Sequence, residues 1–375
     1  MQGNGVTWVR LGDYIEQCDE RNSANVNYPV IGINRDKTFM PTVANLDGVD
    51  IAKYKIITKG MFVFSGMQTG RDICIRIGLY DNEQPALVSP AYTTFVINDD
   101  KKVLPEYFFM YFNRAESNRY GWFISDSSVR ANLDWPRFLD IEIPLPSPAE
   151  QQKVVNVWKA FREIKEQNEA KAAPLMQVCQ SYIQELKHKY PMQEIGPYIE
   201  EYDERNSNEA YGLDDVRGIS IEKKIIDTKA NMDGVKLSPY KVFRPNTFCY
   251  VTITSRNGEK ITLSLNNDNR CYIVSSSYIT FRINRKDQIL PRFLYLWFCR
   301  PEFDRYTRFN SWGSAREAFS FEDMKRCKVP LPPIEVQQAI VNIYKCANEA
   351  KQIAEEADRL SREVCPALLQ HVMHS

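Results

Sequence analysis

Hydrophobic and polar residues alternate in two different ways along the chain. Two segments of about 145 residues mix short β-branched and aromatic runs, such as KYKIITKGMFVFSGM (53–67), with turn residues such as Asp47-Gly48 and Asp233-Gly234. This mixture is typical of short strands with a few helices. Each segment is followed by a polar stretch without internal glycine, in which apolar residues recur every three or four positions. The pattern predicts an α+β fold in four parts: domain 1–147, helix 148–190, domain 191–332 and helix 333–375.

The two halves are copies of one unit. GDYIEQCDERNS (12–23) returns as GPYIEEYDERNS (196–207), SPAYTTFVIN (89–98) as SSSYITFRIN (275–284), and IPLPSPAEQQKVVN (143–156) as VPLPPIEVQQAIVN (329–342). The offset is 184 residues at the first block and 186 afterwards. A period this long exceeds that of a solenoid repeat, so each copy must contain a whole domain. Within the copies, PEYFFMYFNRAES (105–117) and PRFLYLWFCRPEF (291–303) each predict one helix that starts with proline.

The long helices carry a heptad pattern. Its a and d positions in the second copy are Ile340, Ile343, Ala347, Ala350, Ala354, Ala357, Ser361, Val364, Leu368 and His371. A shift by 186 gives Val154, Val157, Phe161, Ile164, Asn168, Lys171, Leu175, Val178, Tyr182 and Glu185. We expect the helices to pair antiparallel as a coiled coil about a pseudo-twofold axis, in a rod of roughly 60 Å that separates the two domains. Pro174 and Pro366 should kink the helices or end a segment.

Composition excludes several classes of protein. The 48 basic and 48 acidic residues cancel, which excludes a binder that depends on a large basic excess to hold nucleic acid. By segment the net charges are −3 for residues 1–147 and +3 for residues 191–333, so the balance is assembled from parts of opposite sign. Nine scattered cysteines without a CxxC pair predict mostly buried thiols in a reducing cytosol. There is no run of about 18 apolar residues and no secretory signal, so no membrane association is expected.

The duplication, the long helices and the junction motifs at 144–152 and 330–338 together resemble the specificity subunit of type I restriction-modification systems. This resemblance implies two target-recognition domains separated by helical spacers. The chain would then read a bipartite double-stranded DNA target, one half-site per domain, in the cytoplasm of a bacterium or archaeon. It would itself be non-catalytic and without cofactor. Two methyltransferase subunits would supply adenine-N6 methylation with S-adenosylmethionine, and restriction-translocase subunits would supply cleavage with ATP and Mg²⁺.

Three pairs of segments are candidates for DNA contact. The first pair holds Gln68, Thr69 and Arg71 in one copy and Ser255, Arg256, Asn257 and Lys260 in the other. Arginine matches guanine, and glutamine or asparagine matches adenine, in bidentate geometry. The second pair aligns Ser128 with Ser314 and Arg130 with Arg316, and the third sets Arg35 and Lys37 against Lys223 and Lys224. The competing interpretations are ordinary polar turns, helix capping by Ser128 and Ser314, and solvated charges.

Other features are interpreted as structural or absent. DERNS (19–23 and 203–207) is identical in both copies, whereas domains that read different half-sites should differ at base contacts, so it predicts a cap or ion-pair element. No methyltransferase catalytic motif or P-loop occurs, and His188, His371 and His374 do not make a zinc site. Two alternatives remain: a coiled-coil scaffold with two protein-binding heads, and the recognition portion of a split methyltransferase-nuclease.

Overall fold

The structure, a computed structural model, describes residues 6–67, 69–126, 128, 131–254, 260–313 and 316–374. The chain forms two compact units, and both long helices contribute to each of them. Unit 1 comprises Met1–Gln167 and Ile353–Ser375, and unit 2 comprises Asn168–Gln352. The long helices are α5 (Pro148–Lys189) and α9 (Ile334–His374). The boundary between the two compact units crosses both of these helices.

Unit 1 contains ten short strands and three short helices in addition to its parts of α5 and α9, among the residues described. The strands are β1 (Thr7–Arg10), β2 (Ile15–Cys18), β3 (Ile31–Ile33), β4 (Phe39–Pro41), β5 (Lys55–Ile57), β6 (Phe62–Ser65), β7 (Arg76–Leu79), β8 (Ala86–Val88), β9 (Thr93–Ile97) and β10 (Glu142–Leu145). The short helices are α2 (Pro105–Phe112), α3 (Ala115–Phe123) and α4 (Trp135–Leu139), and a single helical turn, α1 (Thr69–Asp72), follows β6.

Unit 2 has the matching set. Its strands are β11 (Met192–Glu194), β12 (Ile199–Tyr202), β13 (Arg217–Ile219), β14 (Ile225–Asp227), β15 (Lys241–Phe243), β16 (Thr247–Val251), β17 (Leu263–Leu265), β18 (Tyr272–Val274), β19 (Tyr278–Ile283) and β20 (Lys328–Pro330). Its helices are α6 (Pro291–Phe298), α7 (Pro301–Phe309) and α8 (Phe321–Lys325).

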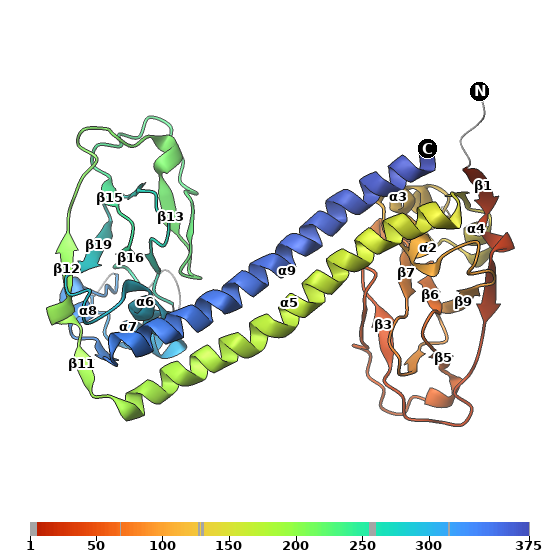
Figure 1. Cartoon of the computed structure of the whole chain (residues 1–375), viewed down its shortest axis with the longest axis horizontal. Helices are drawn as coiled ribbons and strands as arrows, with labels where there is room; N and C mark the ends of the chain where they lie inside the picture. Colours follow the sequence, from red (N-terminus) through yellow and green to blue (C-terminus); the bar gives the residue numbers. More distant parts are fainter. Residues whose placement is uncertain are drawn as a thin grey trace. The chain divides into compact units, whose positions relative to one another are not determined.

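The sheets have the same topology in both units. The four-stranded sheet has the order β2-β9-β6-β7 in unit 1 and β12-β19-β16-β17 in unit 2, with every pair antiparallel. The two-stranded pairs also correspond: β1-β10 with β11-β20, β3-β4 with β13-β14, and β5-β8 with β15-β18. Figure 1 shows each set of strands with its short helices beside the long ones. The predicted duplication is thus a duplication of the α+β fold.

The cores of the units match at the level of single rings. Phe62 stacks on Phe95 at 5.0 Å in unit 1, and Phe248 stacks on Phe281 at 4.8 Å at the equivalent positions of unit 2. In β6 and β16 consecutive residues are buried, which means that both faces of these two strands are covered. The left-handed glycines Gly48 and Gly234 confirm the two predicted Asp-Gly turns.

Each unit packs its short helices against the two long ones in the same way. In unit 1 one buried cluster joins α2 to the start of α5 and the end of α9; its members are Tyr107, Met110, Val154, Val155, Cys365, Leu369 and Val372. The same positions in unit 2 all belong to one core: Phe293, Leu296, Ile340, Val341, Cys179, Ile183 and Leu186. Within unit 1, Lys165 on α5 also forms an ion pair with Asp358 on α9 at 2.8 Å. The long helices therefore pair antiparallel within each unit.

Three details differ from the sequence-based expectations. First, each predicted helix at 105–117 and 291–303 is two helices, because Arg114 and Arg300 adopt extended backbone at the start of α3 and α7. Arg300 precedes a proline, which disfavours helical geometry. Second, α5 and α9 continue through Pro174 and Pro366, so neither proline ends a helix. Third, the buried stripe shifts by one position near the end of each long helix, to Cys179, Ile183 and Leu186 and to Cys365, Leu369 and Val372.

Candidate nucleic-acid interface

The first two pairs of predicted segments lie together in each unit. In unit 1 the carbonyl of Gly66, just after β6, accepts hydrogen bonds from the Leu133 amide at 2.9 Å and the Thr69 hydroxyl at 2.8 Å. A Cβ at residue 66 would lie 1.7 Å from the Leu133 carbonyl oxygen, so only glycine fits. The segment 65–72 is therefore joined to the end of the segment 125–132.

Unit 2 joins the equivalent segments with similar bonds. The Phe319 amide donates to the Thr252 carbonyl at 2.8 Å, and the Thr254 amide donates to the Glu317 carbonyl at 3.1 Å. The Thr254 hydroxyl also donates to Ser311 at 2.8 Å. The described ends of the segments 254–260 and 310–319 are thus joined by hydrogen bonds. We call the described residues of these joined segments the loop surface of each unit: those of 65–72 with 125–132, and those of 254–260 with 310–319.

The third pair of segments reaches the same surfaces. Arg35 is exposed and donates to the Asp72 carbonyl at 3.3 Å, at the end of α1. In unit 2, Lys260 forms an ion pair with Glu222 at 2.9 Å, next to the exposed Lys224. Three segments that are separate in sequence therefore converge in each copy, as a composite binding surface requires.

Two of the predicted lysines are interior residues. Lys37 is 5% exposed and its ammonium donates to the Phe112 carbonyl and to Asn118. Lys223 is 4% exposed and forms an ion pair with Asp304 at 2.6 Å. Both have left-handed backbone, with φ near +60°. Both ammonium groups are buried and bound to partners inside their domain, so neither lysine belongs to a loop surface.

Of the predicted serine and threonine contacts, Thr69 and Ser128 lie among the described residues, and both hydroxyls bond within the protein. Thr69 is buried, and its hydroxyl donates a hydrogen bond to the Gly66 carbonyl. Ser128 is exposed, but its hydroxyl donates to Asp126 at 2.5 Å in a turn, and the adjacent helix α4 is capped by Asp134. The capping interpretation of Ser128 is therefore wrong. Hydrogen bonds from the Ser128 hydroxyl and the Asn132 amide lower the pKa of the Asp126 carboxyl.

Several candidates are not placed. Gln68, Arg130, Ser255, Arg256, Asn257 and Ser314 lie outside the described residues, and the structure gives no surroundings for the Arg71 side chain. Arg316 is described and exposed on the loop surface of unit 2.

Two residues at the loop surface of unit 1, Ala131 within it and Ile73 directly after it, have an unfavourable backbone conformation. Ile73 has φ +47° and Ala131 has φ +42°, although left-handed backbone costs about 1 kcal/mol or more for residues with a Cβ. A β-branched residue such as Ile73 tolerates this region least. Such strain persists only where surrounding contacts fix it, and it is typical of functional loops.

Sequence reasoning did not single out the exposed aromatic residues beside these surfaces. Phe123 is 81% exposed at the end of α3 and Phe309 is 79% exposed at the end of α7. Trp122 and Trp312 are also exposed. Comparison of the two copies could have revealed the pair, because Phe123 and Phe309 are 186 residues apart.

The DERNS segments are structural, as predicted. Asp19 pairs with Arg21 and with the buried Lys55 at 3.0 Å, and Asp203 pairs with Arg205 and Lys241 at 3.1 Å. These ion pairs tie the segment to β5 in unit 1 and to β15 in unit 2. The repeated sequence is therefore explained by the fold.

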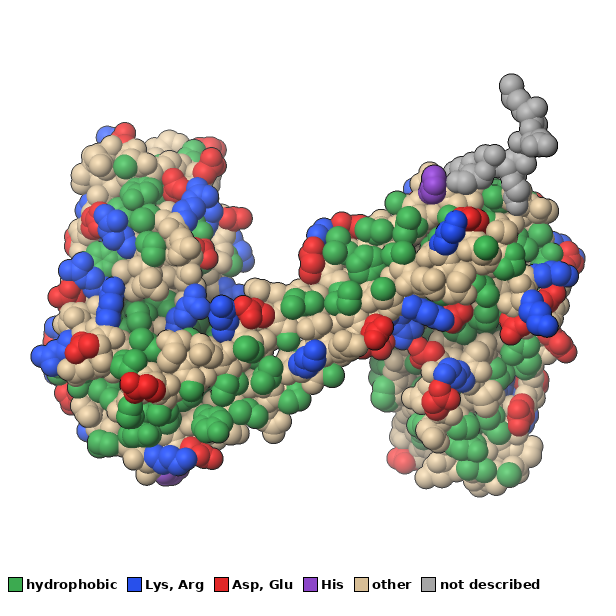
Figure 2. Space-filling model, viewed as in Figure 1, with side chains coloured by type: hydrophobic (Ala, Val, Ile, Leu, Met, Phe, Trp, Pro, Cys, Tyr) green, Lys and Arg blue, Asp and Glu red, His purple; other side chains and the backbone are tan. Residues whose placement is uncertain are grey.

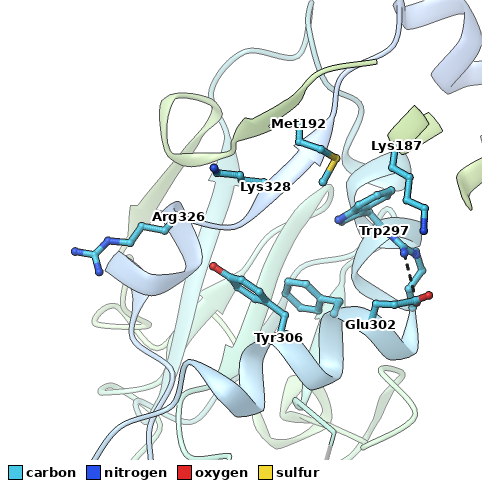
Figure 3. A pocket seen from close by; sticks show the side chains of 9 residues that line it. Lys187, Met192, Trp297, Glu302, Tyr306, Arg326 and Lys328 are labelled. Atoms are coloured by element: carbon cyan, nitrogen blue, oxygen red, sulfur yellow. Dashed lines mark ion pairs between the residues drawn. The ribbon is translucent and has the colours of Figure 1, made fainter. Parts of the chain in front are cut away.

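Unit 2 also has a pocket of about 330 Å³ with a basic rim. Figure 3 shows Lys187 next to Trp297 on one side of the pocket and Arg326 and Lys328 toward the other side. Arg300 forms an ion pair with Glu302 at 3.4 Å. The positions equivalent to the three rim cations in unit 1 are Met373, Asp140 and Glu142. Because these three cations have no basic counterpart in unit 1, the basic rim does not account for a function that both copies share.

The described residues offer little else for chemistry. No group of three or more His, Cys, Asp or Glu side chains that could hold a metal ion occurs in the described part of the chain. Nor does any described helix have the length and apolar character needed to cross a membrane. Figure 2 shows basic and acidic side chains interspersed over both units, consistent with the balanced composition.

Comparison with known proteins identifies the family. Residues 9–173 and 212–355 match the model of the type I restriction modification DNA specificity domain. The chain belongs to this family. The chain is 20% identical to the putative type I restriction enzyme MjaX specificity subunit of Methanocaldococcus jannaschii, over 93% of this chain and 88% of that protein.

A solved structure supports the fold of this specificity subunit. The S subunit of a type I restriction-modification system from M. genitalium aligns with a TM-score of 0.64 and 13% identity, covering 99% of this chain and 97% of that one. At this identity the likeness establishes the fold alone. The two-domain α+β architecture expected from the sequence is thereby confirmed.

Proposed function

We propose that this chain reads a bipartite DNA target, with the loop surface of each unit contacting one half-site. The observation that carries the proposal is the repetition of one composite surface on two copies of one scaffold, with different side chains in each. A protein with two similar domains suits a DNA target with two half-sites, because each domain can contact one half-site in a similar way. Non-identical loop residues then give non-identical half-sites.

The chemistry belongs to partner subunits in this proposal. Two methyltransferase subunits transfer a methyl group from S-adenosylmethionine to adenine N6 within the bound target. A restriction-translocase subunit adds cleavage driven by ATP with Mg²⁺. This chain contributes position and sequence selection and remains non-catalytic.

Zero net charge supports dependence on those partners. Non-specific affinity comes mainly from phosphate neutralisation, and this chain has no basic excess to supply it. We expect the isolated chain to bind DNA weakly at physiological salt, and the complex with methyltransferase to bind its target much more tightly.

Methylation mapping tests the proposal directly. The chain is co-expressed with its methyltransferase in a host without adenine methylation, and N6-methyladenine is mapped across the genome. The expected result is one gapped motif with two different half-sites. Methylation without sequence preference, or no assembly with a methyltransferase, would contradict it and favour a scaffold with two protein-binding heads.

Paired variants assign the half-sites. Arg316→Ala should relax or weaken recognition at one half-site only, by roughly 1–3 kcal/mol if a bidentate base contact is lost. Arg35→Ala should affect the other half-site. Lys153→Ala, an exposed lysine on α5 paired with Glu150, is the matched control and should leave the motif unchanged. Equal loss at both half-sites would indicate a phosphate contact or damaged folding.

A further inference from the structure

A second repeated motif lies on the helices that lead into the loop surfaces. In α3 and α7 four residues are identical between the copies in the order E-x-x-R-Y-x-x-F; they are Glu116, Arg119, Tyr120 and Phe123, and Glu302, Arg305, Tyr306 and Phe309. The positions between them differ, for example Gly121 against Thr307 and Trp122 against Arg308. The two copies have therefore diverged around these four residues.

Burial does not explain the two phenylalanines. Their exposed fractions of 81% and 79% are nearly equal, and buried apolar surface is what normally fixes a large aromatic residue. Of the two tyrosines in the motif, Tyr120 is 48% exposed, whereas Tyr306 is partly buried. Tyr306 contacts Phe319 of the unit 2 core at 6.4 Å, so it helps to anchor its helix. Phe123 does stack on Tyr120 of its own helix, with ring centroids 6.4 Å apart, but packing in the core does not account for the identity of Phe123 and Phe309.

Both helices are fixed at or next to the loop surface of their own unit: α3 contacts Ile75, three residues after the segment 65–72, and the residue that follows α7 by two positions contacts Thr254. In unit 1 the amide of Ile75 donates to Asn118 on α3 at 3.2 Å, and Gly121 packs so closely on Ile75 that a Cβ would lie 2.4 Å from it. In unit 2 Ser311, two residues after Phe309, accepts the hydrogen bond from Thr254. Each exposed ring therefore stands at the border of a loop surface.

An exposed arginine accompanies each ring. Arg119 and Arg305 lie four residues before Phe123 and Phe309, which places cation and ring on one face of the helix. Arg119 has only a loose surface ion pair, with Glu116 at 3.5 Å. An arginine next to an exposed aromatic ring matches the two chemical groups of nucleic acid, the phosphate and the face of a base.

We propose that the pairs Arg119–Phe123 and Arg305–Phe309 are DNA contacts that do not depend on sequence, one pair in each unit. The arginine binds a backbone phosphate, and the phenylalanine stacks on a base or inserts at a base step that the bound complex has opened. Since the pairs are identical in two units that read different half-sites, they position the DNA and leave base selection to the loops. The inference rests on the proposed function and adds a contact to it.

Base stacking gives the sharpest readout. Target duplexes carry 2-aminopurine at successive positions of each half-site, other than the adenine that is methylated, and fluorescence is measured with the complex of this chain and methyltransferase. Phe123→Ala should abolish the fluorescence change at one half-site and weaken binding about tenfold, the loss of one stacked base. Phe309→Ala should do the same at the other half-site. Phe123→Trp keeps a ring and should retain both properties.

Salt dependence tests the arginines. Arg119→Ala or Arg305→Ala should weaken binding equally for matched and mismatched targets and reduce the salt slope by about one. Val43→Ala and Leu213→Ala remove exposed apolar side chains elsewhere in units 1 and 2, and should leave fluorescence and affinity unchanged.

The outcomes separate this inference from the proposed function. If the wild-type complex reads a bipartite motif but Phe123→Ala and Phe309→Ala bind with unchanged fluorescence and affinity, the inference is wrong and the function stands. If either variant fails to assemble with methyltransferase, the rings contact protein and the inference is again wrong. If the wild-type complex selects no sequence at all, the proposed function itself fails.

Discussion

Lys37 and Lys223 occupy equivalent buried positions with different partners. The Lys37 ammonium donates to the neutral Asn118 at 2.8 Å, whereas Lys223 is paired with the carboxylate of Asp304, the residue equivalent to Asn118. Burial lowers the pKa of Lys37 to about 8. In the unfolded chain a lysine titrates near 10.4, so between these values the unfolded state binds more protons than the folded one.

Stability of unit 1 should therefore rise with pH between about 8 and 10.4. The limiting slope for one group is about 1.4 kcal/mol per pH unit. Asn118→Asp supplies the missing carboxylate, raises the pKa of Lys37 and should remove this slope. Urea unfolding at several pH values, followed by tryptophan fluorescence, measures the effect. Parallel pH curves for wild type and Asn118→Asp would show that Lys37 does not titrate in this range.

The first glutamine of each junction has a structural role. Gln151 accepts from the Leu104 amide at 2.9 Å and donates to the carbonyls of Lys102 and Pro146 at 2.8 and 2.9 Å. Gln337 makes the same three bonds, to Leu290, Gln288 and Pro332, with equal lengths. Each glutamine is fully buried and links the start of a long helix to the segment before α2 or α6.

Gln337→Ala should destabilise unit 2 by about 3 kcal/mol, because it leaves buried backbone groups without partners. Gln338→Ala is the matched control, since Gln338 is exposed and bonds only Asn342 on its own helix. We expect a change below about 0.5 kcal/mol for the control. Urea titration measures the free energy of unfolding of both variants. Equal losses for Gln337→Ala and Gln338→Ala would argue against a structural role of the three hydrogen bonds of Gln337.

At the residue scale the sequence predicted types of role better than positions in space. The identity of DERNS in both copies correctly indicated a structural element, because a repeated ion pair leaves a repeated sequence. Lys37 and Lys223 were expected at the surface, since a charged turn carries no periodicity that reports burial. The convergence of three segments into each loop surface depends on contacts such as Leu133 with Gly66, which no local pattern encodes.

The buried stripe of each long helix departs from the predicted heptads at one end. Val178, Tyr182 and Glu185 were expected in the seam of α5, but Cys179, Ile183 and Leu186 are buried instead. A straight α-helix has 3.6 residues per turn, so its buried face drifts by about one residue over several heptads. The shift falls at equivalent positions in both helices, where each packs on the globular part of its unit.

Neighbouring residues on α9 make this register testable. Leu369→Ala should cost about 2–5 kcal/mol of stability in unit 1, because Leu369 is buried in the cluster with Tyr107 and Val154. Leu368→Ala changes the same residue type at a predicted seam position that is only partly buried, and it should cost clearly less. Thermal unfolding compares the two. A larger loss of stability for Leu368→Ala than for Leu369→Ala would support the predicted heptad register instead.

Element boundaries were predictable where periodicity was long and strong. The two helices of about 40 residues were evident from the sequence, whereas the breaks before α3 and α7 were missed. Those breaks occupy two residues each, Asn113-Arg114 and Cys299-Arg300, too short to disturb an apolar stripe. Pro174 and Pro366 were expected to kink the helices or end a segment. Neither ends a helix, because helix length and packing on both sides outweigh the cost of one proline.

At the scale of the whole molecule, the two units are interchangeable in their contacts with the long helices. All seven residues that join α2, α5 and α9 in unit 1 have equivalents that join α6, α9 and α5 in unit 2. The two long helices swap roles between the units. In unit 1 the globular part packs on the start of α5 and the end of α9, and in unit 2 it packs on the start of α9 and the end of α5. Because the scaffold is common and the loop surfaces differ, specificity should transfer with the globular part.

A graft tests this transfer. Residues 11–145 replace residues 195–331, so that both long helices keep their native sequence and Tyr107 and Met110 take the places of Phe293 and Leu296. The graft should fold, because Ile340, Val341 and Ile183 are apolar residues close in size to Val154, Val155 and Leu369, against which Tyr107 and Met110 pack in unit 1. Methylation mapping should then show a symmetric motif with the half-site of unit 1 on both sides and the original spacing. Retention of the original asymmetric motif would mean that bases are read outside the grafted segment, and would reject the loop surfaces as the recognition elements.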